Sequence, residues 1–145
     1  MILLDTNVLS ALMQREPDAA VVGWLDSQSA ESIWTTSITV FEVRTGLELL
    51  EAGNRRRALQ RAFDQLLAGE LDGRVQSFDQ SAAVAAGTIA ADRQRAGRTL
   101  EVRDVQIAGI ALARKATLAT RNLRHFEGLG VDLVDPWSVA GSAPL

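Results

Sequence analysis

Short apolar runs alternate along this chain with longer segments whose apolar residues recur at helical spacing. The short runs predict β-strands at residues 2–4, 32–36, 74–78, 116–120 and 131–134. The longer segments predict helices near residues 6–13, 18–28, 38–52, 54–71, 79–96 and 103–115, the fifth of them ending at a glycine typical of a C-terminal cap, Gly97. Because strands that alternate with helices usually run parallel, the pattern predicts an α/β fold: a three-layer α/β/α domain around a central, mainly parallel sheet.

The first strand-to-helix transition, MILLDTNVLSAL, contains a polar triplet between two apolar segments. Asp5 or Thr6 would cap the following helix by accepting hydrogen bonds from its first amides. Asp5 would also lie at the carboxyl end of a central parallel strand, where open α/β sheets bind their ligands. This stretch alone leaves both interpretations open.

Further polar side chains follow the later strands. Glu42 opens the helix after the second predicted strand, and Asp104 lies near the start of the last long helix. Thr120 and Asn122 come directly after the fourth predicted strand. The carboxyl ends of parallel strands and the N-termini of the following helices share one edge of the sheet. We therefore expect the three carboxylates, with Asp5 as the third, and the Asn122 amide to converge at that edge.

Each of these acids also has a purely structural explanation. Thr39 and Glu42 have the spacing of a capping box, in which Glu42 reaches back to the Thr39 amide. Asp104 would stabilise the dipole of its helix. Three carboxylates at one edge nevertheless repel one another unless a cation neutralises them. Oxygen ligands without histidine or cysteine favour Mg²⁺ or Mn²⁺, so the acids together predict a metal site in which Asp5 is a ligand first and a cap second.

Composition narrows the class of protein. The 145 residues suffice for one domain, which we expect over residues 1–137 with a short polar tail at 138–145, and 47% hydrophobic and 23% charged residues are ordinary values. No apolar run has the length of a membrane span, and the N-terminus lacks the basic region of a signal peptide. The chain has no cysteine for disulfides or thiolate sites. We expect a cytoplasmic protein without a membrane partner.

The net charge of −3 conceals an uneven distribution of basic residues. They are concentrated in three net-positive stretches, 53–61, 93–103 and 114–125, and all but one of the 15 are arginine. Arginine is suited to bidentate contacts with phosphate, although each stretch alone is also typical of a solvated helix face. The charge distribution is therefore compatible with a nucleic-acid partner.

Four stretches resemble the motif series of PIN-domain ribonucleases, in particular the VapC and FitB toxins of prokaryotic toxin-antitoxin pairs. They are MILLDTNVLSAL (1–12), TSITVFEVRTGL (36–47), RDVQIAGIALA (103–113) and LATRNLRHF (118–126), with DPW (135–137) in the usual closing position. The resemblance covers Met1 to about Trp137, and the correct order of the acids makes it fairly specific. It implies a PIN-like nuclease domain.

The resemblance also implies an activity and partners. It implies a Mg²⁺- or Mn²⁺-dependent endoribonuclease that hydrolyses RNA phosphodiester bonds, inhibits growth as a toxin, binds a cognate antitoxin and forms a homodimer. Asp5, Glu42 and Asp104 match the metal-binding acids of the family, Thr6 matches its accessory hydroxyl, and Asn122 occupies the fourth-ligand position. Many members have aspartate there, so the uncharged Asn122 amide predicts a single metal in the free enzyme.

Other residues near these acids complete the expected site. Four are expected to contact substrate: Thr6, Thr120, Arg121 and Arg124. His125 is the only histidine and has no candidate nucleophile beside it, so we expect a structural or phosphate-contacting role. The three tryptophans lie in apolar segments and are expected in the core: Trp24, Trp34 and Trp137.

Three alternatives stay open at this point. A degenerate PIN-like domain would bind antitoxin or RNA without cutting it. A receiver-type signalling domain would need a lysine after the last core strand, whereas the single lysine, Lys115, precedes the fourth predicted strand. A phosphatase of the haloacid-dehalogenase type would need a second aspartate at position 7, where Asn7 stands.

Overall fold

The computed structural model describes residues 1–99 and 101–141. Its centre is a five-stranded sheet in the order β3-β2-β1-β4-β5, and every pair of neighbouring strands is parallel. The strands are β1 (Ile2–Leu4), β2 (Ile33–Thr36), β3 (Val75–Gln76), β4 (Thr117–Ala119) and β5 (Asp132–Val134). The predicted parallel sheet is confirmed.

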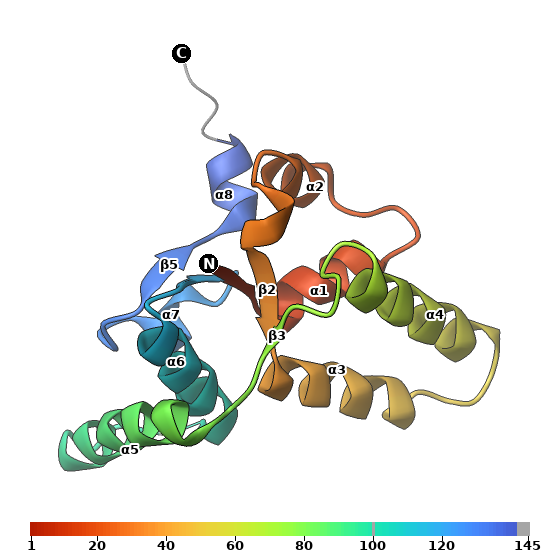
Figure 1. The fold of residues 1–145 in the computed structure, drawn as a ribbon. Helices are drawn as coiled ribbons and strands as arrows, with labels where there is room; N and C mark the ends of the chain where they lie inside the picture. Colours follow the sequence, from red (N-terminus) through yellow and green to blue (C-terminus); the bar gives the residue numbers. More distant parts are fainter. Residues whose placement is uncertain (100, 142–145) are drawn as a thin grey trace.

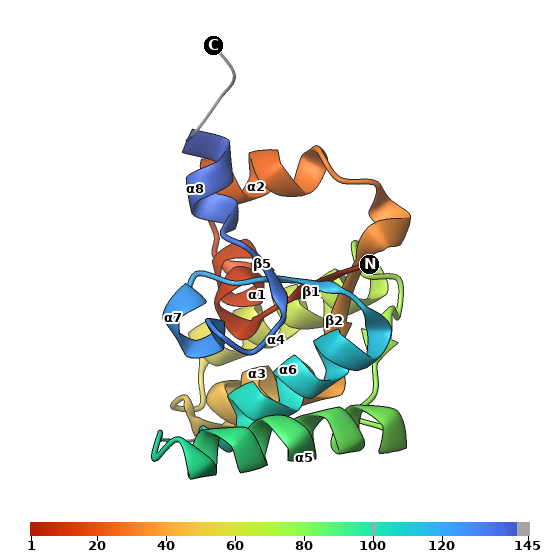
Figure 2. The same cartoon turned by 90° about the vertical axis from the view of Figure 1, so that its left-hand side faces the viewer.

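Helices cover both faces of this sheet and make three layers (Figures 1 and 2). They are α1 (Thr6–Met13), α2 (Ala19–Asp26), the short 3₁₀ helix η1 (Ala30–Ser32), α3 (Ser37–Leu49), α4 (Asn54–Ala68), α5 (Gln80–Arg95), α6 (Val102–Arg114), α7 (Leu123–Phe126) and α8 (Pro136–Gly141). One hydrophobic core includes residues of α1 to α4, and a second includes residues of α5 to α7. The three-layer α/β/α architecture is confirmed.

The two central strands contribute to both cores. Leu3 and Leu118 pair across β1 and β4 and pack in the core beneath α5 and α6. Leu4 and Ala119, the next pair in the register, pack in the core on the opposite face. Successive side chains of a strand point to opposite faces, so a strand covered on both sides has a continuous apolar run such as ILL.

The strand order creates a crevice at one edge of the sheet. The chain proceeds from β1 to β2 and β3 on one side, whereas β4 and β5 lie on the other side of β1. In open α/β sheets, ligands bind outside the carboxyl ends of the strands at such a reversal. Asp5 directly follows β1 and Thr120 directly follows β4, so the fold places both at this position.

Two helices are shorter than the hydrophobic pattern predicted. The pattern predicted helices to residues 52 and 71, but α3 ends at Leu49 and α4 at Ala68. After α4 the chain turns and buries Leu71 completely, and Gly73 adopts a φ of +71°, which favours glycine. An apolar residue buried just beyond a helix can fall at the helical spacing of the apolar residues before it. This explains why the predicted helix was too long.

The predicted cap at Gly97 is confirmed. Its φ is +67°, its amide donates to the Gln94 carbonyl at 3.0 Å, and the Arg98 amide donates to the Arg93 carbonyl at 2.9 Å. These bonds form a Schellman motif, which satisfies the last free carbonyls of α5.

Three short elements were not predicted: η1, α7 and α8. Each is too short to show a clear helical period. The predicted tail at 138–145 begins inside α8, and its residues 142–145 lie outside the described residues. Within the described part of the chain, no helix combines the length and apolar character needed to cross a membrane.

The close contact of α5 with α6 depends on a missing side chain. A Cβ atom on Gly109 of α6 would lie 2.6 Å from the Ala82 carbonyl oxygen and 2.7 Å from the Ala86 Cβ atom. Both distances are shorter than van der Waals contact, and both neighbours are rigid parts of α5. Gly109 is therefore needed for this packing.

We predict that Gly109→Ala lowers the free energy of unfolding by about 1–3 kcal/mol, because the added methyl group forces the two helices apart. Urea denaturation measures the change. Gly87→Ala on α5 is the matched control, since nothing lies within 4 Å of its added Cβ. The control should stabilise the protein by roughly 0.5–1 kcal/mol through helix propensity. Wild-type stability in Gly109→Ala would contradict the packing argument.

Candidate active site at the carboxyl edge of the sheet

Asp5 is the most buried acid of the site, with 5% of its surface exposed. It is the N-cap of α1, and its Oδ1 atom accepts a hydrogen bond from the Thr6 amide at 2.9 Å. Its Oδ2 atom accepts from the Thr120 hydroxyl at 2.8 Å and from the Asn7 side-chain amide at 3.4 Å. The residue therefore caps the helix with one oxygen, and three polar groups from two neighbouring strand ends hold its carboxylate.

Thr120 connects the loops after β1 and β4. It is fully buried; besides donating to Asp5, its hydroxyl accepts from the Asn7 side chain at 3.2 Å and from the Asn122 amide at 3.0 Å. The Asn7 Oδ1 atom in turn accepts from the Arg121 amide at 3.0 Å. This bracing role of Asn7 was not predicted from the sequence, where the residue only spoke against a phosphatase. Its position two residues after Asp5 was the available signal for this bracing role.

Glu42 does not form the capping box with Thr39 that its spacing allows, so the structural alternative for this residue does not hold. The N-cap of α3 is Thr36, whose hydroxyl accepts from the Thr39 amide at 3.0 Å, so the helix begins earlier than the pattern indicated. Glu42 lies further along α3, where its Oε1 atom accepts from the Thr6 hydroxyl at 3.3 Å. Its Oε2 atom is 3.8 Å from the guanidinium of Arg103. The carboxylate is thus directed toward the start of α1, not toward its own helix terminus.

Asp104 lies in the first turn of α6, as predicted. Its Oδ2 atom is 3.0 Å from the Nδ1 atom of His125, at the C-terminal end of α7. Asp104 and Glu42 each expose 20% of their side chains, so both are accessible at the surface. His125 is therefore a direct neighbour of a site carboxylate.

The three carboxylates influence one another electrostatically. Burial raises the pKa of Asp5, Glu42 and Asp104 above the usual carboxyl range. The Asp5 charge further raises the pKa of both other acids, and the Asp104 charge raises that of Glu42. Cations and hydrogen bonds oppose the effect: Arg103 lowers the pKa of Glu42, His125 that of Asp104 and Thr120 that of Asp5. The structure thus brings together the three acids expected to converge.

These donors are chemically suited to a hard divalent cation. All three are carboxylate oxygens, and their mutual repulsion would be relieved by a positive charge between them. As placed here, no three acidic or histidine side chains among the described residues enclose a metal position. Each carboxylate faces an internal partner instead: Asp5 the Thr120 hydroxyl, Glu42 the Arg103 guanidinium and Asp104 the His125 ring.

Asn122, the expected fourth position, is exposed at the N-cap of α7, and its side chain makes no capping bond. Only its backbone amide joins the network around Asp5, through the Thr120 hydroxyl. The residue therefore lies next to Thr120 through its backbone, and its side chain has no hydrogen bond assigned among the described residues.

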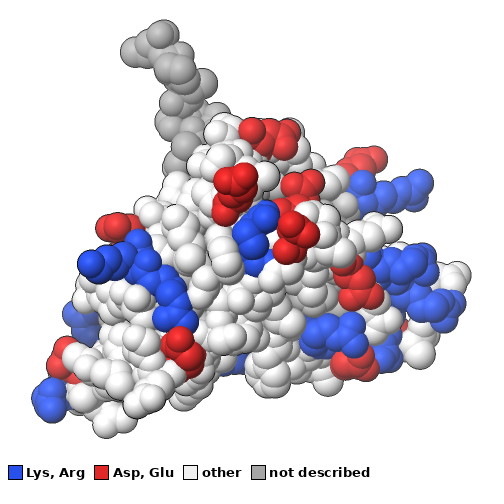
Figure 3. Space-filling model, in the orientation of Figure 1, with Lys and Arg blue, Asp and Glu red and all other residues white. Residues whose placement is uncertain are grey.

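The basic residues expected near the acids are separated in space. Arg121 stacks on the Trp137 ring at 4.7 Å, and Arg124 lines a hollow together with Asp104 and His125. Arg114, from the same basic stretch, ends α6 and pairs with Asp79 at 2.7 Å. Figure 3 shows small groups of basic side chains with acidic ones beside them over one face.

The tryptophan prediction is only partly confirmed. Trp24 is 5% exposed and lies in a core. Trp34 and Trp137 are half-buried at the edges of the two cores. The Trp137 ring, close to the active-site edge through Arg121, is therefore partly available to solvent.

The sequence matches the family model of the PIN domain over residues 2–130. The chain belongs to the PIN-domain family. This membership removes the receiver-type and phosphatase-like alternatives, and the structure agrees with that result. Lys115 caps the C-terminal end of α6, and the Asn7 side chain is used in hydrogen bonds to its neighbours.

Several named proteins are similar to this chain over nearly its whole length. Plasmid stability protein StbB of Pseudomonas syringae pv. tomato is 40% identical over 94% of this chain and 99% of that protein. VapC ribonuclease Y4jK of Sinorhizobium fredii is 39% identical over 97% of this chain and 100% of that protein.

Toxin FitB of Neisseria gonorrhoeae is 34% identical over 94% of this chain and 99% of that protein. The crystal structure of FitAcB from the same organism superimposes with a TM-score of 0.84 at 34% identity, covering 94% of this chain and 99% of the matched chain.

We predict that Glu42→Gln raises the melting temperature in metal-free buffer near neutral pH. The folded-state pKa of Glu42 lies above its unfolded value, so the cost of ionising it in the fold is fully present above the folded pKa. That cost disappears as the pH falls below the unfolded value of about 4, and the difference between variant and wild type should shrink there. Calorimetric scans across this pH range measure the effect.

Asp79→Asn is a control of opposite sign. The Ala82 amide and Arg114 lower the pKa of Asp79, so its charge stabilises the fold above the unfolded pKa, and this is lost as the pH falls through the folded pKa. Neutralising Asp79 should lower the melting temperature near neutral pH. A lowered melting temperature in Glu42→Gln under the same conditions would contradict the repulsion argument.

Proposed function

We propose that this chain is a metal-dependent endoribonuclease that acts as the toxin of a toxin-antitoxin pair. The observation that carries the proposal is the proximity of Asp5, Glu42 and Asp104, which come from the N-cap of α1, from α3 and from the first turn of α6 and influence one another's pKa at the crevice of a PIN domain. The relatives named as a VapC ribonuclease and a FitB toxin support it, since the similarity covers at least 94% of this chain. A degenerate PIN domain would not need to retain three mutually repelling acids.

The acids are the expected holders of a divalent cation, Mg²⁺ or Mn²⁺. PIN-domain nucleases of the VapC type generally use divalent metal ions. When bound, such an ion would lower the pKa of a water molecule and neutralise charge on the scissile phosphate. The protein's own contribution is to hold the ligands: Thr120 and Asn7 fix the orientation of Asp5, and Thr6 does so for Glu42.

The expected substrate contacts divide into two kinds. Arg121 and Arg124 are exposed near the acids, and we assign them to phosphate groups flanking the cleaved bond. Thr120 is fully buried, so we assign it to positioning Asp5 in place of the expected contact with RNA. The Thr6 hydroxyl already donates a hydrogen bond to Glu42, so we assign it to orienting that carboxylate. It also remains the expected accessory hydroxyl of the site. His125 orients Asp104 from the other side.

Protein partners follow from the same proposal. A toxin must be held inactive by a cognate antitoxin, and cellular RNA as substrate places the chain in the cytoplasm. Exposed apolar side chains occur on three helices, including Phe41 at 58%, Val84 at 66% and Val102 at 62%. Exposed apolar groups of this kind support protein-protein contact, and the expected homodimer stays a prediction.

We predict that Asp5→Asn, Glu42→Gln and Asp104→Asn each reduce RNA cleavage by at least about a hundredfold in Mg²⁺ or Mn²⁺, because each removes a charged ligand. Gel analysis of RNA incubated with the purified chain measures cleavage, and circular dichroism verifies that each variant is folded. Glu70→Gln is the matched control, since Glu70 is exposed and outside the site. Near-wild-type cleavage by one of the three variants would remove that residue from the ligand set. A wild-type chain that does not cut RNA would favour the degenerate alternative.

We predict that Asn122→Asp tightens Mg²⁺ binding roughly tenfold, because a fourth carboxylate adds charge beside the three acids. The wild type should bind one ion, since about three negative charges balance one divalent cation and fall short of two. Calorimetric titration without RNA measures affinity and stoichiometry. Asn54→Asp at the start of α4 is the control for an added charge elsewhere. Two tight sites in the wild type, or weaker binding by Asn122→Asp, would refute this account.

A further inference from the structure

Two adjoining hollows lead away from the acidic site along the C-terminal end of α5. The first, of about 290 Å³, has Asp104, His125 and Arg124 in its wall. The second, of about 300 Å³, lies further along and includes Arg98. The two hollows share Arg93 and Leu129, so they are neighbours around the same side chains. Together they form a groove that begins at a site carboxylate; we call it the α5 groove.

The arginines of the α5 groove have no carboxylate partner in the described part of the chain. The ion pairs found there include none with Arg93, Arg98 or Arg124. The groove's other acids are paired with arginines that do not line it: Asp92 with Arg95 at 3.2 Å and Glu101 with Arg103 at 3.4 Å. Positive charge in the groove is therefore available to a ligand.

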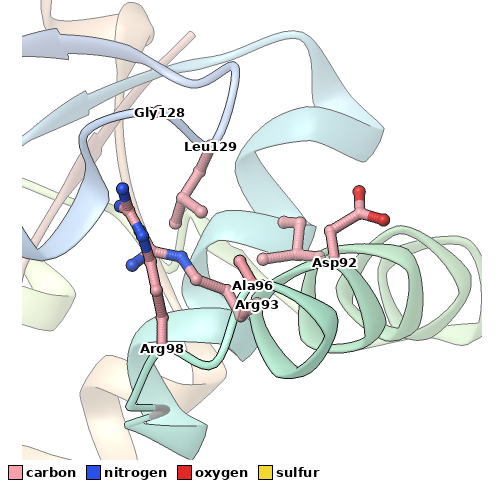
Figure 4. A pocket seen from close by; sticks show the side chains of 7 residues that line it. Asp92, Arg93, Ala96, Arg98, Gly128 and Leu129 are labelled. Carbon is pink, nitrogen blue, oxygen red and sulfur yellow. The ribbon is translucent and has the colours of Figure 1, made fainter.

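The side chains in the second hollow are arranged for an anion. Figure 4 shows that Arg93 and Arg98 extend toward the loop at Gly128, whereas the Asp92 carboxylate points to the other side. The Arg93 guanidinium donates to the Glu127 carbonyl at 3.1 Å, so its direction is fixed by the same loop. Two guanidinium groups directed into one hollow repel each other, and a phosphate between them would relieve that repulsion.

We propose that the α5 groove binds the sugar-phosphate backbone of single-stranded RNA on one side of the cleaved bond. The proposal rests on the proposed nuclease function, because the groove starts at Asp104 and His125. Arg124 would contact the phosphate nearest the site, and Arg93 and Arg98 would contact phosphates further along. The remaining wall is largely aliphatic and small, with Ile89, Ala96, Val105 and Leu129, and the only aromatic ring among the lining residues is the His125 imidazole, which is held by Asp104 beside the acids. The contacts would thus be independent of base sequence.

RNA binding in the presence of EDTA tests the groove separately from catalysis. We would titrate fluorescein-labelled RNA of about twelve nucleotides, and a labelled dinucleotide too short to extend along the groove, with the wild type and Arg93→Gln/Arg98→Gln. The variant should bind the longer RNA roughly tenfold more weakly, and its salt slope should fall by about 1.4, or about 0.7 for each lost contact. Its affinity for the dinucleotide should be unchanged.

Two further variants make the result specific. Arg55→Gln/Arg61→Gln removes the same charge from exposed positions on α4, remote from the groove, and should leave the affinity close to wild type. The double variant loses the hydrogen bond between Arg93 and the Glu127 carbonyl, and this loss could disturb the fold. Arg98→Gln alone avoids that problem, because the Arg98 side chain makes no hydrogen bond in the described residues. It should lower the salt slope by about half as much as the double variant does.

The groove proposal would be wrong if the α4 control lost as much RNA affinity as Arg93→Gln/Arg98→Gln. It would also be wrong if that variant lost as much affinity for the dinucleotide as for the longer RNA. A wild-type chain that binds neither RNA would also overturn it. Failure of the proposed nuclease function would give a different result. The chain would then bind the longer RNA through the groove but would not cleave it after Mg²⁺ or Mn²⁺ is added back.

Discussion

The active-site edge depends on the burial of one carboxylate, that of Asp5. Almost the whole side chain is removed from water at the point where the sheet reverses its order, and burial raises its pKa. A charged group in such a place must be satisfied by hydrogen bonds. The Thr6 amide, the Thr120 hydroxyl and the Asn7 side chain provide them, and in doing so they join the loops after β1 and β4. The same bonds that satisfy Asp5 therefore define the shape of the crevice.

The other two acids lie on α3 and in the first turn of α6, and their charges are only partly compensated within the protein. Arg103 faces Glu42 at 3.8 Å, and His125 faces Asp104 at 3.0 Å. These partners are half-exposed side chains, whereas the groups that hold Asp5 are largely buried. The site thus combines one buried, firmly oriented carboxylate with two whose internal partners are exposed to solvent. This combination reconciles a stable fold with a cluster of like charge.

An acidic protein with a polyanionic substrate needs locally arranged positive charge. The basic residues of the three net-positive stretches have different roles in the folded protein. Part of the last stretch is used structurally, since Arg114 pairs with Asp79 at the far end of α6. In contrast, Arg93, Arg98 and Arg124 come from two stretches and line adjoining hollows beside the acids. Basic residues that are neighbours in sequence are therefore not equivalent in function.

The sequence by itself determined the elements with strong periodicity and the order of the acids along them. Alternating strands and helices required a parallel sheet, and a parallel sheet required Asp5, Glu42 and Asp104 to lie at one edge, because its strand ends point the same way. Tertiary structure decided what periodicity does not encode. Leu71 is buried beyond the end of α4, the N-cap of α3 is Thr36, and the short helices α7 and α8 depend on packing. Two further features exist only in the folded chain: the hydrogen bond between Asn7 and Thr120, which are 113 positions apart, and the hollow that Arg93 and Arg124 share. Contacts between such distant residues arise from the packing of helices and strands and not from local sequence preference.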